Sequence, residues 1–114
     1  MKIIDIISKF GLEIKAVGDP QKEIRGCYVS DMLSDVLANA KEGNLWITRQ
    51  THPNIIGVAS IKELSGILIA GNKEIEPDTL NKACAENITV MTSPLQTFEI
   101  AGALYSFLTQ GTEK

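Results

Sequence analysis

The chain contains few of the residues that build metal centres. Among its 114 residues it has one histidine, His52, and two cysteines, Cys27 and Cys84. Structural zinc and iron–sulfur sites need about four thiolate or imidazole ligands, which one molecule of this chain does not supply. We therefore expect no metal or other cofactor. Both cysteines fall in predicted regular elements where small apolar side chains are favoured, so we expect buried free thiols.

Arginine and continuous apolar sequence are also scarce. Only two of the eleven basic residues are arginines, Arg25 and Arg49, and the net charge is -3. No basic stripe is present to neutralise a phosphate backbone, so we expect no nucleic-acid partner. The apolar runs are short, and Asp5 interrupts the apolar start of the chain where a signal peptide would continue. We expect a cytoplasmic protein with no membrane partner.

Catalytic motifs are missing as well. No serine, cysteine or lysine stands beside an identifiable base, so nucleophilic catalysis has no support in the sequence. The phosphate-binding loop Gly-x-x-x-x-Gly-Lys-Ser/Thr is absent. We therefore predict that the protein is not an enzyme, with an enzyme of unknown reaction kept as the third alternative.

The clearest positive feature is a set of three runs in which apolar residues are consecutive rather than alternating. Each run precedes a break and then a helix-start signal. Such runs are typical of strands buried on both faces, which occur where helices cover a parallel sheet. We predict one α/β domain over residues 1–114, a three-layer α/β/α fold with a central, largely parallel sheet. The runs are residues 45–48, 67–70 and 88–92.

Other elements are expected around these strands. Apolar periodicity predicts a first helix from Ile3 to Phe10, with Gly11 as its C-terminal cap. Partial alternation predicts an edge strand over residues 12–17, with Leu12, Ile14 and Ala16 on one side. The remaining predicted elements are a strand over residues 24–29 and helices over residues 31–40, 53–63 and 78–87.

The last predicted strand leads into a capping box. Ser93 is placed at the cap, Pro94 at the first helical position and Gln96 three residues after the serine. The final helix then carries an apolar stripe that we expect to face the core. Its members are Leu95, Phe98, Ala101, Leu104, Tyr105 and Leu108.

Polar residues follow the predicted strands, and in open α/β sheets ligands bind at that edge. Arg49 comes directly after a buried run and is suited to a bidentate grip on a carboxylate or phosphate. The alternative for Arg49 is a solvated loop arginine. Gly71 and Asn72 offer an amide and a backbone that tolerates positive φ, although Gly-Asn is also a turn signal.

Free N–H groups at a helix start after Thr51 and His52 favour an anion, and capping by Thr51 is the alternative. Capping also explains Ser30 and Ser93. Thr97 lies one turn into the final helix, where it would face the same edge. The candidate ligand-binding residues are therefore Ser30, Arg49, Thr51, His52, Gly71, Asn72, Ser93 and Thr97.

Three segments carry a family resemblance. They are Ile24–Leu33 (IRGCYVSDML), Glu42–Thr48 (EGNLWIT) and Gly66–Asn72 (GILIAGN). In this order they resemble the DRTGG domain, a small α/β module that is similar to the amino-terminal domain of HPr kinase/phosphorylase and, more remotely, to those of Mur ligases. Both signature loops depart from the family: Arg49-Gln50-Thr51-His52 stands where Asp-Arg is frequent, and Ala70-Gly71-Asn72 where Thr-Gly-Gly is frequent.

The resemblance implies a function. In relatives the module is fused to effector domains that carry the chemistry, so it implies a non-catalytic regulatory or small-ligand-binding module. The partners we expect are a second copy, giving a homodimer, and an anionic small molecule or a partner protein. The second hypothesis is a structural adaptor for a redox or hydrogenase system, because similar stand-alone chains carry iron–sulfur hydrogenase labels.

Overall fold

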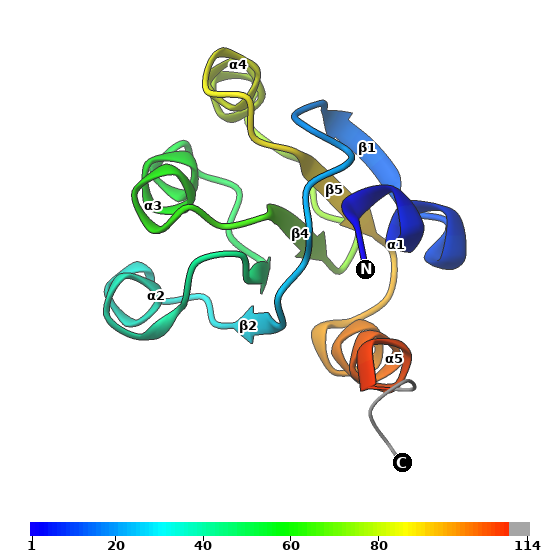
Figure 1. The fold of residues 1–114 in the computed structure, drawn as a ribbon. Coiled ribbons are helices and arrows are strands. Elements are labelled where there is room, and N and C mark those ends of the chain that lie inside the picture. Colours follow the sequence, from blue (N-terminus) through cyan, green and yellow to red (C-terminus); the bar gives the residue numbers. More distant parts are fainter. Residues whose placement is uncertain (110–114) are drawn as a thin grey trace.

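The computed structural model describes residues 1–109, which fold around one five-stranded sheet in the order β1-β5-β4-β3-β2 (Figure 1). Strands β2, β3, β4 and β5 are parallel to one another, and β1 runs antiparallel to β5. The strands are β1 (Glu13–Ala16), β2 (Cys27–Val29), β3 (Leu45–Thr48), β4 (Gly66–Ala70) and β5 (Val90–Ser93). The helices are α1 (Ile3–Phe10), α2 (Leu33–Asn39), α3 (Asn54–Lys62), α4 (Pro77–Ala85) and α5 (Thr97–Thr109).

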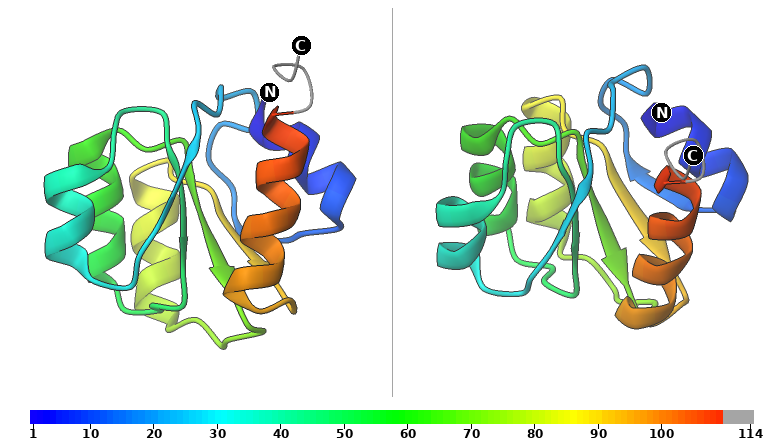
Figure 2. Two further views of the ribbon diagram at one scale, coloured as in Figure 1. Left: turned by 90° about the horizontal axis from the view of Figure 1, so that it is seen from below. Right: turned by 60° about the horizontal axis from the view of Figure 1, so that its bottom comes forward.

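The helices form two layers. Helices α2, α3 and α4 cover one face of the sheet, whereas α1 and α5 cover the other (Figure 2). The predicted three-layer α/β/α architecture is therefore confirmed, and the three predicted apolar runs form the three central strands. All residues of β3, β4 and β5 are buried, as expected for strands with helices on both sides.

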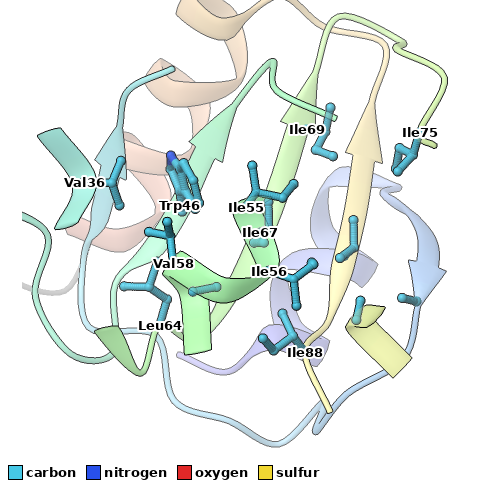
Figure 3. Packing of buried hydrophobic residues seen from close by; sticks show 14 of the residues in the cluster. Val36, Trp46, Ile55, Ile56, Val58, Leu64, Ile67, Ile69, Ile75 and Ile88 are labelled. Carbon is cyan, nitrogen blue, oxygen red and sulfur yellow. The ribbon is translucent and has the colours of Figure 1, made fainter. Parts of the chain in front are cut away.

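Two apolar clusters make up the core, one on each face. Figure 3 shows the cluster under α2, α3 and α4, where Trp46 lies among isoleucines from α3 and β4. The indole Nε1 of Trp46 donates a hydrogen bond to the Ser30 carbonyl at 2.8 Å, which ties the end of β2 to β3. On the opposite face α1 and α5 pack on Leu45, Ile47 and Leu68.

Strand β1 is an edge strand as predicted, but its faces differ from the prediction. The register with β5 passes from Ile14 opposite Met91 directly to Ala16 opposite Val90, so the pairing contains a bulge. Because a bulge inserts an unpaired residue, it reverses the expected alternation. Leu12 therefore packs in the α1/α5 cluster and Ala16 in the opposite one, while Ile14 stays exposed.

Helix α5 begins one turn later than predicted. Ser93 is the last residue of β5, and its Oγ accepts a hydrogen bond from the Leu95 N–H at 3.1 Å instead of capping a helix. The Gln96 N–H donates to Glu99 Oε1 at 3.0 Å, so Gln96 precedes the first helical residue. The first turn of the helix thus starts at Thr97.

The expected core stripe of α5 is only partly buried. Leu104 of the stripe is buried, as is Ile100 outside it, whereas Phe98 is 88% exposed and Tyr105 is 71% exposed. The two exposed aromatic residues lie on α5 beyond the residues that pack in the α1/α5 cluster, so the stripe continues past the edge of the core. The predicted inward orientation of Phe98 and Tyr105 is therefore wrong.

The expected burial of the two cysteines needs correction. Cys84 is exposed and Cys27 is half-buried, so only the prediction that both thiols are free is confirmed. Helix α1 does end at Gly11 in the left-handed conformation, with φ of 60°, as predicted. Within residues 1–109 no helix has the length and apolar character needed to cross a membrane.

Candidate functional site

Arg49 joins three loops at the carboxyl edge of the sheet. It follows β3, and its Nη1 donates a hydrogen bond to Gln96 Oε1 in the loop after β5, at 2.9 Å. The guanidinium also lies over Gly71 in the loop after β4. A Cβ at Gly71 would come within 2.6 Å of Arg49 Nη1, and Gly71 has φ of +87°. Glycine is therefore required here for both the backbone conformation and the close approach.

Asp31 fixes the backbone of the Arg49 loop. Its Oδ1 accepts hydrogen bonds from Thr48 Oγ1 at 2.8 Å and from the Arg49 N–H at 2.7 Å. The Gln50 side-chain amide donates to the Asp31 carbonyl at 2.9 Å. The loop after β2 thus holds the loop after β3, which positions the arginine side chain.

Backbone hydrogen bonds join the loops after β4 and β5. The Gly71 N–H donates to the Leu95 carbonyl at 2.8 Å, and the Asn72 N–H donates to the Ser93 carbonyl at 3.0 Å. Asn72 is exposed with φ of 56°, the left-handed conformation that asparagine tolerates well. The predicted residues Arg49, Gly71, Asn72 and Ser93 therefore come together at one edge.

The other predicted residues are occupied locally. Ser30 Oγ accepts from the Met32 N–H at 3.1 Å and donates to Asp35, whose pKa is lowered first by this hydrogen bond. The Thr51 carbonyl accepts from Thr79 Oγ1 at 2.6 Å, and Thr51 does not cap α3, which begins at Asn54.

His52 follows β3 and Thr97 follows β5, so both lie after the strands as Arg49 does. His52 is exposed, and its Nδ1 accepts from the Asn54 N–H at 3.2 Å. Thr97 is half-buried in the first turn of α5. Among the hydrogen bonds of residues 1–109, neither residue contacts Arg49.

Two residues outside the predicted set complete this cluster. The sequence predicts Gln96 as a member of the capping box. The later start of α5 leaves its side-chain amide oxygen to accept the hydrogen bond from Arg49. Asp31 follows β2, but sequence does not show that its carboxylate reaches across to the next loop. The signal in the sequence for both residues was a polar side chain within three residues of the end of a strand.

The cluster has the chemistry of an anion-binding surface. A guanidinium has five N–H donors, and one contact to Gln96 leaves most of them for a carboxylate or phosphate. Because Gly71 has no side chain, its backbone can lie directly against the guanidinium. Among residues 1–109 no group of three or more His, Cys, Asp or Glu side chains is placed to hold a metal ion.

A second feature is an apolar groove between β2 and α5, with a volume of about 570 Å³. Its base includes Cys27 and Ile47, and Phe98 and Tyr105 stand along its α5 side. Burial raises the pKa of the Cys27 thiol to about 11, so this thiol is protonated at neutral pH. Arg49 does not line the groove.

Comparison with known proteins gives a structural relationship only. No protein-family model matches the chain, and no curated protein matches it in sequence. Its fold is similar, with a TM-score of 0.69 and 19% identity, to the crystal structure of the CBS and DRTGG domains of the regulatory region of Clostridium perfringens pyrophosphatase, complexed with the activator diadenosine tetraphosphate. The match covers 90% of this chain and 45% of that one, so the chain spans less than half of the matched protein. At this level of identity, the chain shares the α/β fold of part of that regulatory region.

Proposed function

We propose that this protein is a non-catalytic regulatory module that binds a small anionic ligand at the Arg49 cluster and acts through self-association. The observation that carries the ligand site is the position of the Arg49 guanidinium, which lies over Gly71 and is hydrogen-bonded to Gln96. The structural neighbour, a regulatory region in complex with a polyphosphate activator, supports this class of function.

The ligand class follows from charge and shape. Arg49 supplies a planar donor for two oxygens, which suits a phosphate or carboxylate. The neighbouring N–H groups of Gly71 and Asn72 are already bonded to carbonyls after β5, so they hold the loop in place rather than bind the ligand. The anion would therefore be held mainly by side-chain donors at an open edge.

The groove between β2 and α5 supports self-association. The Gly26 carbonyl accepts a hydrogen bond from the Leu45 N–H at 2.9 Å, and the Ser30 N–H donates to the Ile47 carbonyl at 3.2 Å. Gly26 and Ser30 therefore direct backbone groups to β3. Backbone groups alternate along a strand, so those of Cys27 and Val29 face the open edge of the sheet. A two-fold axis beside β2 would place the projecting Phe98 of each copy against the groove of the other, which is the self-complementarity that a dimer requires.

The ligand site is tested by thermal-shift screening with inorganic phosphate, nucleotides and diadenosine tetraphosphate, followed by calorimetric titration of the best anion. Arg49→Ala should weaken that binding by about ten- to a hundredfold, the value of a charge-assisted pair. Arg25→Ala is the matched control, because it removes the other arginine at the opposite edge of the sheet. Equal affinity of Arg49→Ala and the unaltered protein would refute the site.

Self-association is tested by light scattering at micromolar concentration, where we expect about twice the chain mass of 12.4 kDa. Phe98→Glu should convert the dimer to a monomer. Ile61→Glu on α3 is the matched control, since Ile61 is 73% exposed on the opposite face. A monomer at all concentrations would refute the dimer and favour the adaptor hypothesis, in which the same groove takes a partner protein.

A further inference from the structure

A polar cavity lies at the edge of the sheet opposite to Arg49. Its volume is about 360 Å³, and it is lined by the segments that precede β2, β3, β4 and β5. This size is at the lower end of the range for small-molecule sites, about 300–1,000 Å³. The cavity therefore suits a small ligand, and it is separated from the Arg49 cluster by the length of the strands.

Backbone hydrogen bonds fix the walls of this cavity. The Arg25 N–H donates to the Gly43 carbonyl at 2.8 Å, and the Gly43 N–H donates to the Glu63 carbonyl at 3.0 Å. The stem of Arg25 crosses Gly43 closely enough that a Cβ there would lie 2.9 Å from Arg25 Cδ. Lys22 Nζ donates to the Leu64 carbonyl at 3.3 Å. The charged groups thus stand on a preformed frame.

Glu63 occupies a position where glycine is favoured. It follows the last residue of α3 with φ of 54°, and a left-handed residue at a helix end is most commonly glycine. A glutamate there retains a carboxylate at the cavity despite the conformational cost. Residues held in sparsely populated backbone conformations cluster at functional sites.

The charged side chains that line the cavity are of both signs, and within residues 1–109 they form no salt bridges with one another. Lys22 and Arg25 are cationic, and Glu42, Glu63 and Glu86 are anionic. Within residues 1–109 none of these five groups forms a salt bridge, whereas the remaining carboxylate, Glu23, binds the terminal ammonium at 2.8 Å. The two positive and three negative groups are complementary to a molecule with one negative and two positive groups.

We propose that this cavity binds a free amino acid with a basic side chain, such as lysine or arginine. Arg25 and Lys22 face the ligand carboxylate, and the three glutamates face its ammonium and side-chain cation. The exposed setting of these groups screens their charges, so we expect saturable binding with a Kd of about 1 mM or tighter.

The experiment is calorimetric titration of the whole chain with L-lysine and L-arginine. Arg25→Ala and Glu63→Gly should each weaken binding by about tenfold or more. Glu63→Gly should also raise the melting temperature, which separates loss of binding from loss of folding. Lys73→Ala, in the loop after β4 at the opposite edge, should bind both amino acids as the unaltered protein does.

Putrescine, which has two cations and no carboxylate, tests the role of Arg25. It should bind the unaltered protein more weakly than lysine and be insensitive to Arg25→Ala. The proposal is overturned if neither amino acid binds at 10 mM (about ten times the expected Kd), if Glu63→Gly binds lysine unchanged, or if putrescine binds as tightly as lysine.

Discussion

Gly18 is the position where a single added methyl group should be most damaging. It follows β1 and lies against the backbone that leads into β5. A Cβ at Gly18 would lie 2.6 Å from the Asn87 carbonyl oxygen and 2.7 Å from the Thr89 nitrogen, where ordinary van der Waals contact begins at 3.4 Å. Because both contacts are to backbone, no side-chain rotation relieves them.

The magnitude for Gly18→Ala follows from these contacts. Overpacking of this kind costs about 1–3 kcal/mol. The strand must also move away from Thr89, whose Oγ1 accepts the Gly18 N–H at 3.0 Å, and loss of that hydrogen bond adds about 1 kcal/mol. The free energy of unfolding should therefore fall by about 2–4 kcal/mol, which lowers the melting temperature of a domain this size by about 10–20 °C.

The assay is thermal unfolding followed by circular dichroism, with Gly57→Ala as the control. Gly57 lies inside α3, and within residues 1–109 the nearest atom outside the helix backbone to an added Cβ is Lys82 Nζ at 4.0 Å. Alanine is the better helix former, so Gly57→Ala should stabilise the protein by about 0.5–1 kcal/mol. If Gly18→Ala melts within 2 °C of the unaltered protein (about 0.5 kcal/mol or less), the packing between β1 and β5 described above is wrong.

Four further predictions concern the site, the thiols and the pH dependence of stability. Gly71→Ala should destabilise the protein by about 1–2 kcal/mol and displace the guanidinium above it, so that anion binding falls in titration; unchanged binding would contradict the close approach. A thiol reagent at neutral pH should label exposed Cys84 rapidly and Cys27 only as the protein opens, and a fast phase lost in Cys27→Ala would contradict this assignment. Because the pKa of Cys27 is raised from 9.0 to about 11, its contribution to stability is present below pH 9 and declines as pH rises toward 11, a decline that Cys27→Ala should remove in denaturant titrations. The pKa of Asp35 is lowered, first by the hydrogen bond from Ser30, so its contribution is present above its ordinary pKa of 3.8 and is lost as pH falls through the lowered value; an acid limb unchanged in Asp35→Asn would refute this coupling.

Local sequence was sufficient where one interaction dominates. Consecutive apolar residues indicated β3 to β5 because a strand buried on both faces must be apolar at every position. Gly11 marked the end of α1 because few other residues adopt positive φ at low cost. The loops that follow these strands were therefore also predictable, and so was the position of Arg49 at the carboxyl edge of the sheet.

Features that depend on distant partners were not predictable in this way. The capping box at Ser93 is a valid local signal, yet the loop after β5 bonds to Gly71 and Asn72 instead, and α5 starts a turn later. The bulge in β1 reversed its faces because pairing with β5, and not the alternation of its own residues, determines which side is buried.

The sequence by itself determined the layered α/β fold and the edge where Arg49 lies, because burial periodicity and glycine conformations are local properties of the chain. Only the tertiary structure decided which side chains meet. Several contacts join residues far apart in the chain, and their formation depends on strand order and register. They are the contacts of Arg49 with Gln96 and Gly71, of Asp31 with Thr48, and of Arg25 with Gly43. The same is true of the α5 stripe, because the packing of α5 on the sheet decides which of its apolar residues are buried.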